Sequence, residues 1–140
     1  MRKLLIDSDV ILDLFFERKP HSDSASEIFI LCEKGKIKGF VTPVICSNIY
    51  YILRRVASHP KVIEKLNQLL NIVDVLSMDK EVVLSALGSG FKDFEDALQN
   101  FAAERSQLID AIVTRNVKDY AKSEIGVHAP DSFLKLLHNQ

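Results

Sequence analysis

Short apolar runs alternate along the chain with longer stretches in which apolar residues recur every three or four positions. The short runs have the length of β-strands, and we expect strands at 3–6, 40–41, 72–76 and 109–113, with a fifth candidate at 127–128. The longer stretches have the period of an amphipathic helix. We therefore expect helices from near Val10 and at 22–32, 43–56, 61–70, 80–87, 93–105 and 131–137.

The alternation of strands and helices predicts the fold class. It is typical of β–α–β units, whose parallel strands form a sheet that helices cover on both faces. We predict an α/β fold, a three-layer α/β/α sandwich around a central parallel sheet of four or five strands. The chain has 140 residues and no internal repeat, so residues 1–140 are expected to form a single domain.

Composition excludes some classes of protein. Apolar residues make up 47% of the chain and the formal net charge is −1, so a packed core is expected and nucleic acid could bind only through a local basic patch. The basic, apolar start is interrupted by three aspartates, and no run is long enough for a membrane span. Cys32 and Cys46 lack C-x-x-C spacing and are expected to be reduced, which favours a cytoplasmic protein.

Asp7 directly follows the first apolar run, at the carboxyl end of a strand that we expect to be central. Functional residues of parallel sheets gather at such strand ends. A carboxylate beside a buried sheet needs a neutralising partner, either a basic side chain or a metal ion. Helix capping is the structural alternative, since Asp7, Ser8 or Asp9 could each cap the helix that begins near Val10.

Two further polar groups fall near the same edge of the predicted sheet. Thr114, Asn116 and Asp119 follow the fourth strand, where they could equally form a turn and a cap. Asp93 and Asp96 lie in the first turn of a predicted helix, where acids also interact favourably with the helix dipole. None of these features is specific alone.

Taken together, Asp7, Asp96 and Asp119 are acids that a parallel α/β fold can bring into one place. Oxygen-only ligands suit Mg²⁺ or Mn²⁺. The four histidines are scattered without zinc spacing, and the chain has no glycine-rich phosphate-binding loop. The sequence therefore favours a site for Mg²⁺ or Mn²⁺ over a zinc or nucleotide site.

Four runs of sequence, in order and spread over nearly the whole chain, resemble the PIN domain, the fold of VapC-type toxin ribonucleases. They are Leu-Ile-Asp-Ser-Asp-Val-Ile-Leu-Asp at 5–13, Ser-Asn-Ile-Tyr-Tyr-Ile-Leu at 47–53, Asp-Phe-Glu-Asp-Ala-Leu-Gln at 93–99 and Ile-Val-Thr-Arg-Asn-Val-Lys-Asp-Tyr at 112–120. The resemblance implies a metal-dependent endoribonuclease that hydrolyses RNA phosphodiesters, as the toxin of a toxin–antitoxin pair.

By this resemblance, Asp7, Asp96 and Asp119 hold Mg²⁺ or Mn²⁺, while Thr114 and Asn116 orient water or phosphate. The helix after the second strand usually carries a glutamate in this family, and here Asn48 stands in its place. Asn48 would contribute an oxygen to the site without a charge, and Asp9 would compensate in part. The alternative function is a non-catalytic PIN-like module that binds RNA or protein through a weakened metal site.

The resemblance also implies partners. RNA would bind basic residues, for which the candidates are Arg54, Arg55, Arg115 and Lys118, although each could equally be solvated surface charge. An antitoxin protein and a second copy of the chain, in a homodimer, are the expected protein partners, and no membrane is expected. A phospho-receiver domain shares acids at strand ends, but it needs a lysine after its last strand, where this chain has Val127-His128-Ala129-Pro130.

Overall fold

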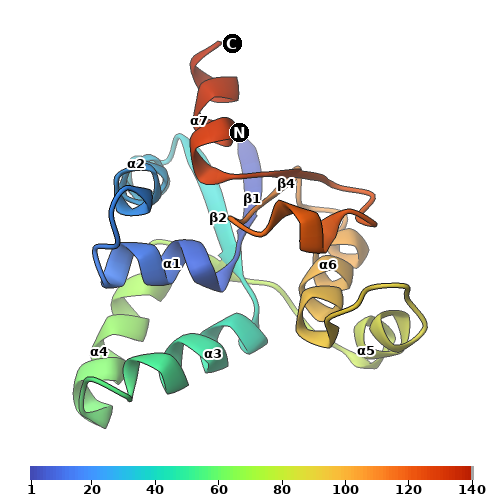
Figure 1. Cartoon of the computed structure of the whole chain (residues 1–140), viewed down its shortest axis with the longest axis horizontal. Helices are drawn as coiled ribbons and strands as arrows, with labels where there is room; N and C mark the ends of the chain where they lie inside the picture. Colours follow the sequence, from blue (N-terminus) through green and yellow to red (C-terminus); the bar gives the residue numbers. More distant parts are fainter. Residues whose placement is uncertain (140) are drawn as a thin grey trace.

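The computed structural model describes residues 1–139, which form a parallel sheet between layers of helices (Figure 1). The strands are β1 (Arg2–Ile6), β2 (Ile37–Val41), β3 (Asp74–Val75), β4 (Ala111–Val113) and β5 (Gly126–His128). The helices are α1 (Ser8–Phe15), α2 (His21–Glu33), α3 (Pro43–Leu53), α4 (His59–Leu70), α5 (Lys80–Leu87), α6 (Phe94–Ser106) and α7 (Pro130–His138), with a 3₁₀ turn, η1 (Val117–Tyr120).

Within the described residues the sheet has five strands in the order β3-β2-β1-β4-β5, and all neighbouring pairs are parallel. Figure 1 shows α1 and α2 on one side of the sheet and α5 and α6 on the other. The predicted three-layer α/β/α sandwich is therefore confirmed, and β1 is its central strand, as expected. Leu4, Leu5 and Ile6 of β1 have no solvent-exposed surface.

The register of β1 and β4 determines where the polar strand ends meet. Ile6 pairs with Val113, so the next residues, Asp7 and Thr114, emerge side by side at the carboxyl edge of the sheet. The backbone N–H of Asp7 donates to the carbonyl of Val113 at 3.0 Å, which continues the ladder by one bond. This edge is where the sequence predicted function to lie.

Several element boundaries differ from the prediction. The third and fourth strands are shorter than expected, and α3 ends at Leu53 rather than at 56, because the following residues form an exposed turn. Cys32 is buried and Cys46 half-buried, and both are free thiols, as predicted. No helix in residues 1–139 is long and apolar enough to cross a membrane.

The second strand begins at Ile37, three residues before the predicted start at 40. Gly39 lies inside β2, paired with Leu4 of β1. A Cβ atom at this position would lie 2.9 Å from the side chain of Ile6 and 3.1 Å from Cys32 Sγ. The glycine is required by close packing of the sheet against α2, a tertiary constraint that a sequence pattern does not reveal.

We predict that Gly39→Ala lowers the free energy of unfolding by about 1–3 kcal/mol, because the added methyl group overfills the core. Urea denaturation of both proteins measures the difference. Gly88→Ala is the matched control, since a Cβ there meets only a backbone oxygen at 3.6 Å. Equal destabilisation of the two variants would contradict the packing explanation.

Candidate active site

Asp7 has both of the roles that its sequence position suggested. It is the N-cap of α1, and its Oδ1 accepts a hydrogen bond from the N–H of Ser8 at 2.8 Å. Its Oδ2 accepts from Thr114 Oγ1 at 3.0 Å and from the hydroxyl of Tyr120 at 3.2 Å. Burial raises the pKa of Asp7, and these donors oppose the rise.

Tyr120 was not identified from the sequence as a site residue. Its side chain is buried, and burial together with the nearby charge of Asp7 raises the pKa of its hydroxyl. The hydroxyl therefore stays protonated and serves Asp7 as a donor. The only sequence signal for it was its position directly after Asp119, at the end of the last polar run.

Behind Asp7 lie two more aspartates of α1. Asp9 Oδ2 accepts from the N–H of Arg115 at 3.1 Å and from Asn116 Nδ2 at 3.2 Å. Its Oδ1 is buried and has no hydrogen-bond partner among the described residues. Burial, and secondly the charge of Asp7, raise the pKa of Asp9 to about 6. Asn116 thus lies close to the acids, as the sequence suggested.

Asp13 explains the position of Arg115. Its fully buried carboxylate accepts from Arg115 Nε at 2.6 Å and Nη2 at 3.1 Å, and it also pairs with Arg18 at 3.1 Å. The guanidinium of Arg115 is therefore directed into the protein. The sequence suggested Arg115 as an RNA contact, but its side chain forms an internal ion pair with a residue 102 positions away.

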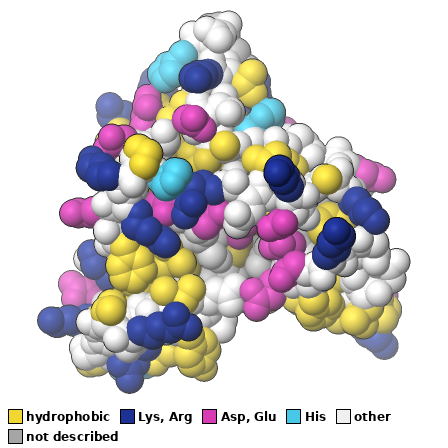
Figure 2. Space-filling model, viewed as in Figure 1, with side chains coloured by type: hydrophobic (Ala, Val, Ile, Leu, Met, Phe, Trp, Pro, Cys, Tyr) yellow, Lys and Arg dark blue, Asp and Glu magenta, His cyan; other side chains and the backbone are white. Residues whose placement is uncertain are grey.

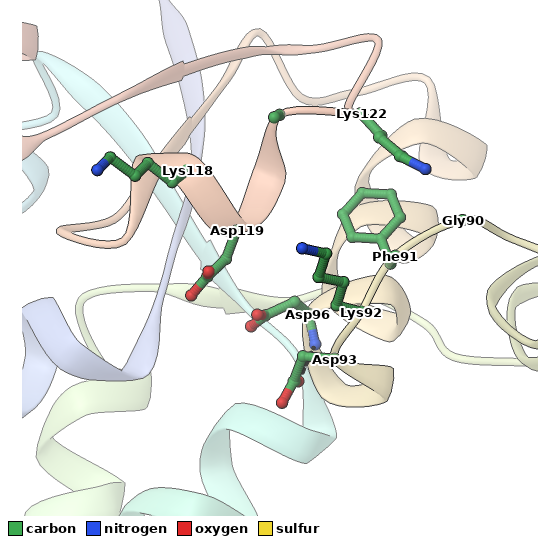
Figure 3. Close-up of a pocket in the computed structure, with 9 residues that line it drawn as sticks. Gly90, Phe91, Lys92, Asp93, Asp96, Lys118, Asp119 and Lys122 are labelled. Carbon is green, nitrogen blue, oxygen red and sulfur yellow. Dashed lines mark hydrogen bonds between the residues drawn. The ribbon is translucent and has the colours of Figure 1, made fainter.

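Asp96 and Asp119 reach the same region from α6 and η1, and Figure 3 shows their carboxylates pointing toward one another. Asp96 is half-buried and Asp119 is exposed. The pKa of Asp96 is raised to about 7, first by burial and then by the charges of Asp93, Asp7 and Asp119. Asp7, Asp96 and Asp119 thus lie within electrostatic reach of one another, and Asp93 also caps α6 by accepting from the N–H of Asp96.

A cleft of about 480 Å³ opens beside these acids. Figure 2 shows acidic side chains gathered in a hollow of the surface, with basic side chains on both sides. The cleft is lined by Gly90, Phe91, Lys92, Asp93, Asp96, Lys118, Asp119, Ala121 and Lys122. Lys118 was expected here from the sequence, whereas Lys92 and Lys122 were not. Their only signal was proximity in sequence to Asp93 and Asp119.

Two of the predicted basic contacts lie elsewhere. Arg54 and Arg55 follow the last residue of α3, which runs away from α6 and η1 (Figure 1). Both are exposed, and Arg54 Nη1 donates to the carbonyl of Ala57 at 2.9 Å, which helps to end the helix. The structure does not bring these two arginines to the acidic cleft.

Asn48 lies half-buried on α3 and faces α6. Its Nδ2 donates to Glu95 Oε2 at 2.9 Å, a contact between residues 47 positions apart. Glu95 is exposed in the first turn of α6, next to Asp96. No partner of Asn48 was predicted from the sequence, because a contact between two helices has no local sequence signal.

The site offers oxygen ligands only, the donor set that Mg²⁺ and Mn²⁺ prefer. The unpartnered buried Oδ1 of Asp9 and the raised pKa values of Asp7, Asp9 and Asp96 indicate excess negative charge. Within residues 1–139, no three His, Cys, Asp or Glu side chains lie close enough to form a ready ligand set. The residues fit a hard divalent cation, which would have to draw the carboxylates together.

The chain matches known proteins in sequence over most of its length. A family model described as PIN domain matches residues 3–118. Ribonuclease VapC1 of Aquifex aeolicus (strain VF5) is 26% identical over 137 residues, which cover 94% of this chain and 92% of that protein.

Solved structures support the fold. A chain of a toxin–antitoxin complex from Klebsiella pneumoniae aligns with a TM-score of 0.68 at 18% identity, over 91% of this chain and 97% of that chain. VapC20 from Mycobacterium tuberculosis, a toxin that cleaves the sarcin–ricin loop, aligns with a TM-score of 0.59 at 16% identity, over 78% of this chain and 86% of that one. At these identities the likeness concerns the fold.

The raised pKa of Asp96 leads to a prediction about stability in metal-free buffer. Between its ordinary pKa of 3.8 and the folded value of about 7, the folded protein holds a proton that the unfolded chain has released. The free energy of unfolding therefore decreases as the pH rises through this window. Asp96→Asn removes that titration, so its melting temperature, measured with EDTA present, should decrease less between pH 5 and 8. A pH profile parallel to that of the wild type would contradict the predicted crowding of charge.

Proposed function

The chain belongs to the PIN domain family, and on this premise we propose that it is a divalent-metal-dependent endoribonuclease of the VapC type. The main support for this proposal is that Asp7, Asp96 and Asp119 lie within electrostatic reach of one another beside a cleft with lysines along its wall. The acids of such a site can bind a cation, and its lysines can bind a polyanion. The relatedness to a ribonuclease, Ribonuclease VapC1, supports the same substrate class.

In this proposal Asp7, Asp96 and Asp119 hold the metal, which is Mg²⁺ or Mn²⁺. A divalent cation held there supplies Lewis acidity toward the phosphate and makes water more acidic. Thr114 and Tyr120 keep the Oδ2 of Asp7 in a fixed direction through their hydroxyl donors. Asn116 orients Asp9, and its exposed amide can also donate to water or to a phosphate oxygen.

Positive charge near the cleft holds the RNA backbone. Lys92, Lys118 and Lys122 line the cleft. Figure 3 shows the ammonium group of Lys92 close to the acids, whereas the side chains of Lys118 and Lys122 extend away from them, and we propose that the three contact different phosphates of the RNA backbone. Arg54 and Arg55 would contact RNA only beyond the cleft, along α3. Arg115 acts structurally, because its ion pair with Asp13 orients the segment that carries Thr114 and Asn116.

Partners follow from the same premise. The Klebsiella pneumoniae neighbour belongs to a toxin–antitoxin complex, and we propose that an antitoxin protein also binds this chain. We propose a cytoplasmic location, where the chain would meet its RNA substrate. A homodimer remains a prediction from the family resemblance.

A non-catalytic binding module is the second candidate, and Asn48 is the observation that favours it. An amide at the position where the family usually has a glutamate lowers the negative charge that α3 contributes to the site. This candidate predicts RNA binding without cleavage.

We predict Mn²⁺-dependent cleavage of a fluorescently labelled RNA, abolished by EDTA and lowered about 100-fold or more in Asp7→Asn, because a ligand carboxylate is lost. Asp23→Asn is the matched control, since Asp23 is an exposed aspartate whose contact is an ion pair with Lys19. Binding without cleavage would favour the second candidate. Cleavage that EDTA leaves unchanged would overturn the metal-dependent mechanism.

A further inference from the structure

Asn48 and Glu95 connect α3 to α6 next to the acidic cleft. Asn48 Nδ2 donates to Glu95 Oε2 at 2.9 Å, and Glu95 directly precedes Asp96 in the first turn of α6. The bond requires a donor at position 48. A glutamate there would instead bring two carboxylates together, and their repulsion would displace the side chain of Glu95.

We propose that Glu95 supplies the fourth carboxylate of the metal site and that Asn48 is the residue that positions it. This inference rests on the proposed function. The family resemblance leads to the expectation of a carboxylate on α3 at position 48. The hydrogen bond holds a carboxylate of α6 against the amide at position 48, so in this proposal the charge is retained and comes from α6 instead of α3.

Two structural roles compete with this assignment. As a first-turn acid, Glu95 interacts favourably with the dipole of α6, and as a partner of Asn48 it links two helices. The dipole does not require a contact with α3, and Asp93 already caps α6. A link between helices requires an acceptor but no negative charge. The charge of Glu95 is therefore what distinguishes a metal ligand from a structural contact.

Glu95→Gln isolates that charge, because the Oε1 of glutamine still accepts a hydrogen bond from Asn48. Calorimetric titration of Mn²⁺ into the full chain should show affinity lowered about tenfold, the order expected when one partly solvated charge is lost near a cation. Glu81→Gln is the matched control, because Glu81 is likewise an exposed first-turn acid but belongs to α5. Equal Mn²⁺ affinity in Glu95→Gln and Glu81→Gln would overturn the assignment.

A charge exchange tests the positioning role of Asn48. Asn48→Glu alone places two carboxylates against each other and should lower the melting temperature in EDTA. The double variant Asn48→Glu/Glu95→Gln reverses donor and acceptor across the same contact. It should regain that melting temperature and bind Mn²⁺ within about twofold of the wild type, because the number of charges is unchanged. If the double variant bound Mn²⁺ as weakly as Glu95→Gln does, this would contradict the idea that residues 48 and 95 can place a carboxylate at the same point.

The outcomes for this inference and for the proposed function are separable. A wild-type chain that binds Mn²⁺ through Glu95 but cleaves no RNA would sustain the inference and refute the nuclease. A wild-type chain that cleaves RNA with Mn²⁺, and whose Glu95→Gln variant binds Mn²⁺ normally, would sustain the nuclease and refute the inference.

Discussion

The negative charge of Asp7 at the buried carboxyl end of β1 is the constraint around which the cleft is organised. The three residues before it, Leu4, Leu5 and Ile6, have no exposed surface, and Asp7 itself is half-buried. Two hydroxyl donors, from Thr114 and Tyr120, and one backbone N–H, from Ser8, offset part of the cost of its burial. The donors do not cancel the charge, since the pKa of Asp7 is still raised. Protonation or a bound cation can neutralise the charge that remains.

The other acids increase this need for a cation. Asp9 and Asp96 also have raised pKa values, and each is raised in part by the charge of Asp7. Arg115, which directly follows Thr114, is bound to Asp13 and is not directed toward the cleft. Lysines line the cleft, where a polyanionic substrate would meet them. Crowding of these carboxylates thus costs the protein stability, a balance common at functional sites.

The sequence revealed the parts of this arrangement that follow from local pattern. Strand ends identified Asp7 and Thr114, because alternating strands and helices predict a parallel sheet whose carboxyl edge is shared. Local patterns do not predict tertiary contacts. The partner of Arg115, the partner of Asn48 and the strand pairing of Gly39 each depend on residues at least 35 positions away. The sequence therefore led to Arg115 as an RNA contact or surface charge and to Asn48 as a metal-site residue, and it revealed the partner of neither.

Anomalous diffraction from crystals grown with Mn²⁺ would show whether these carboxylates form one metal site. We expect an anomalous peak between the carboxylates of Asp7, Asp96 and Asp119, within ligand distance of at least two of them. A peak bound elsewhere on the protein, or no peak in this cleft at millimolar Mn²⁺, would contradict it.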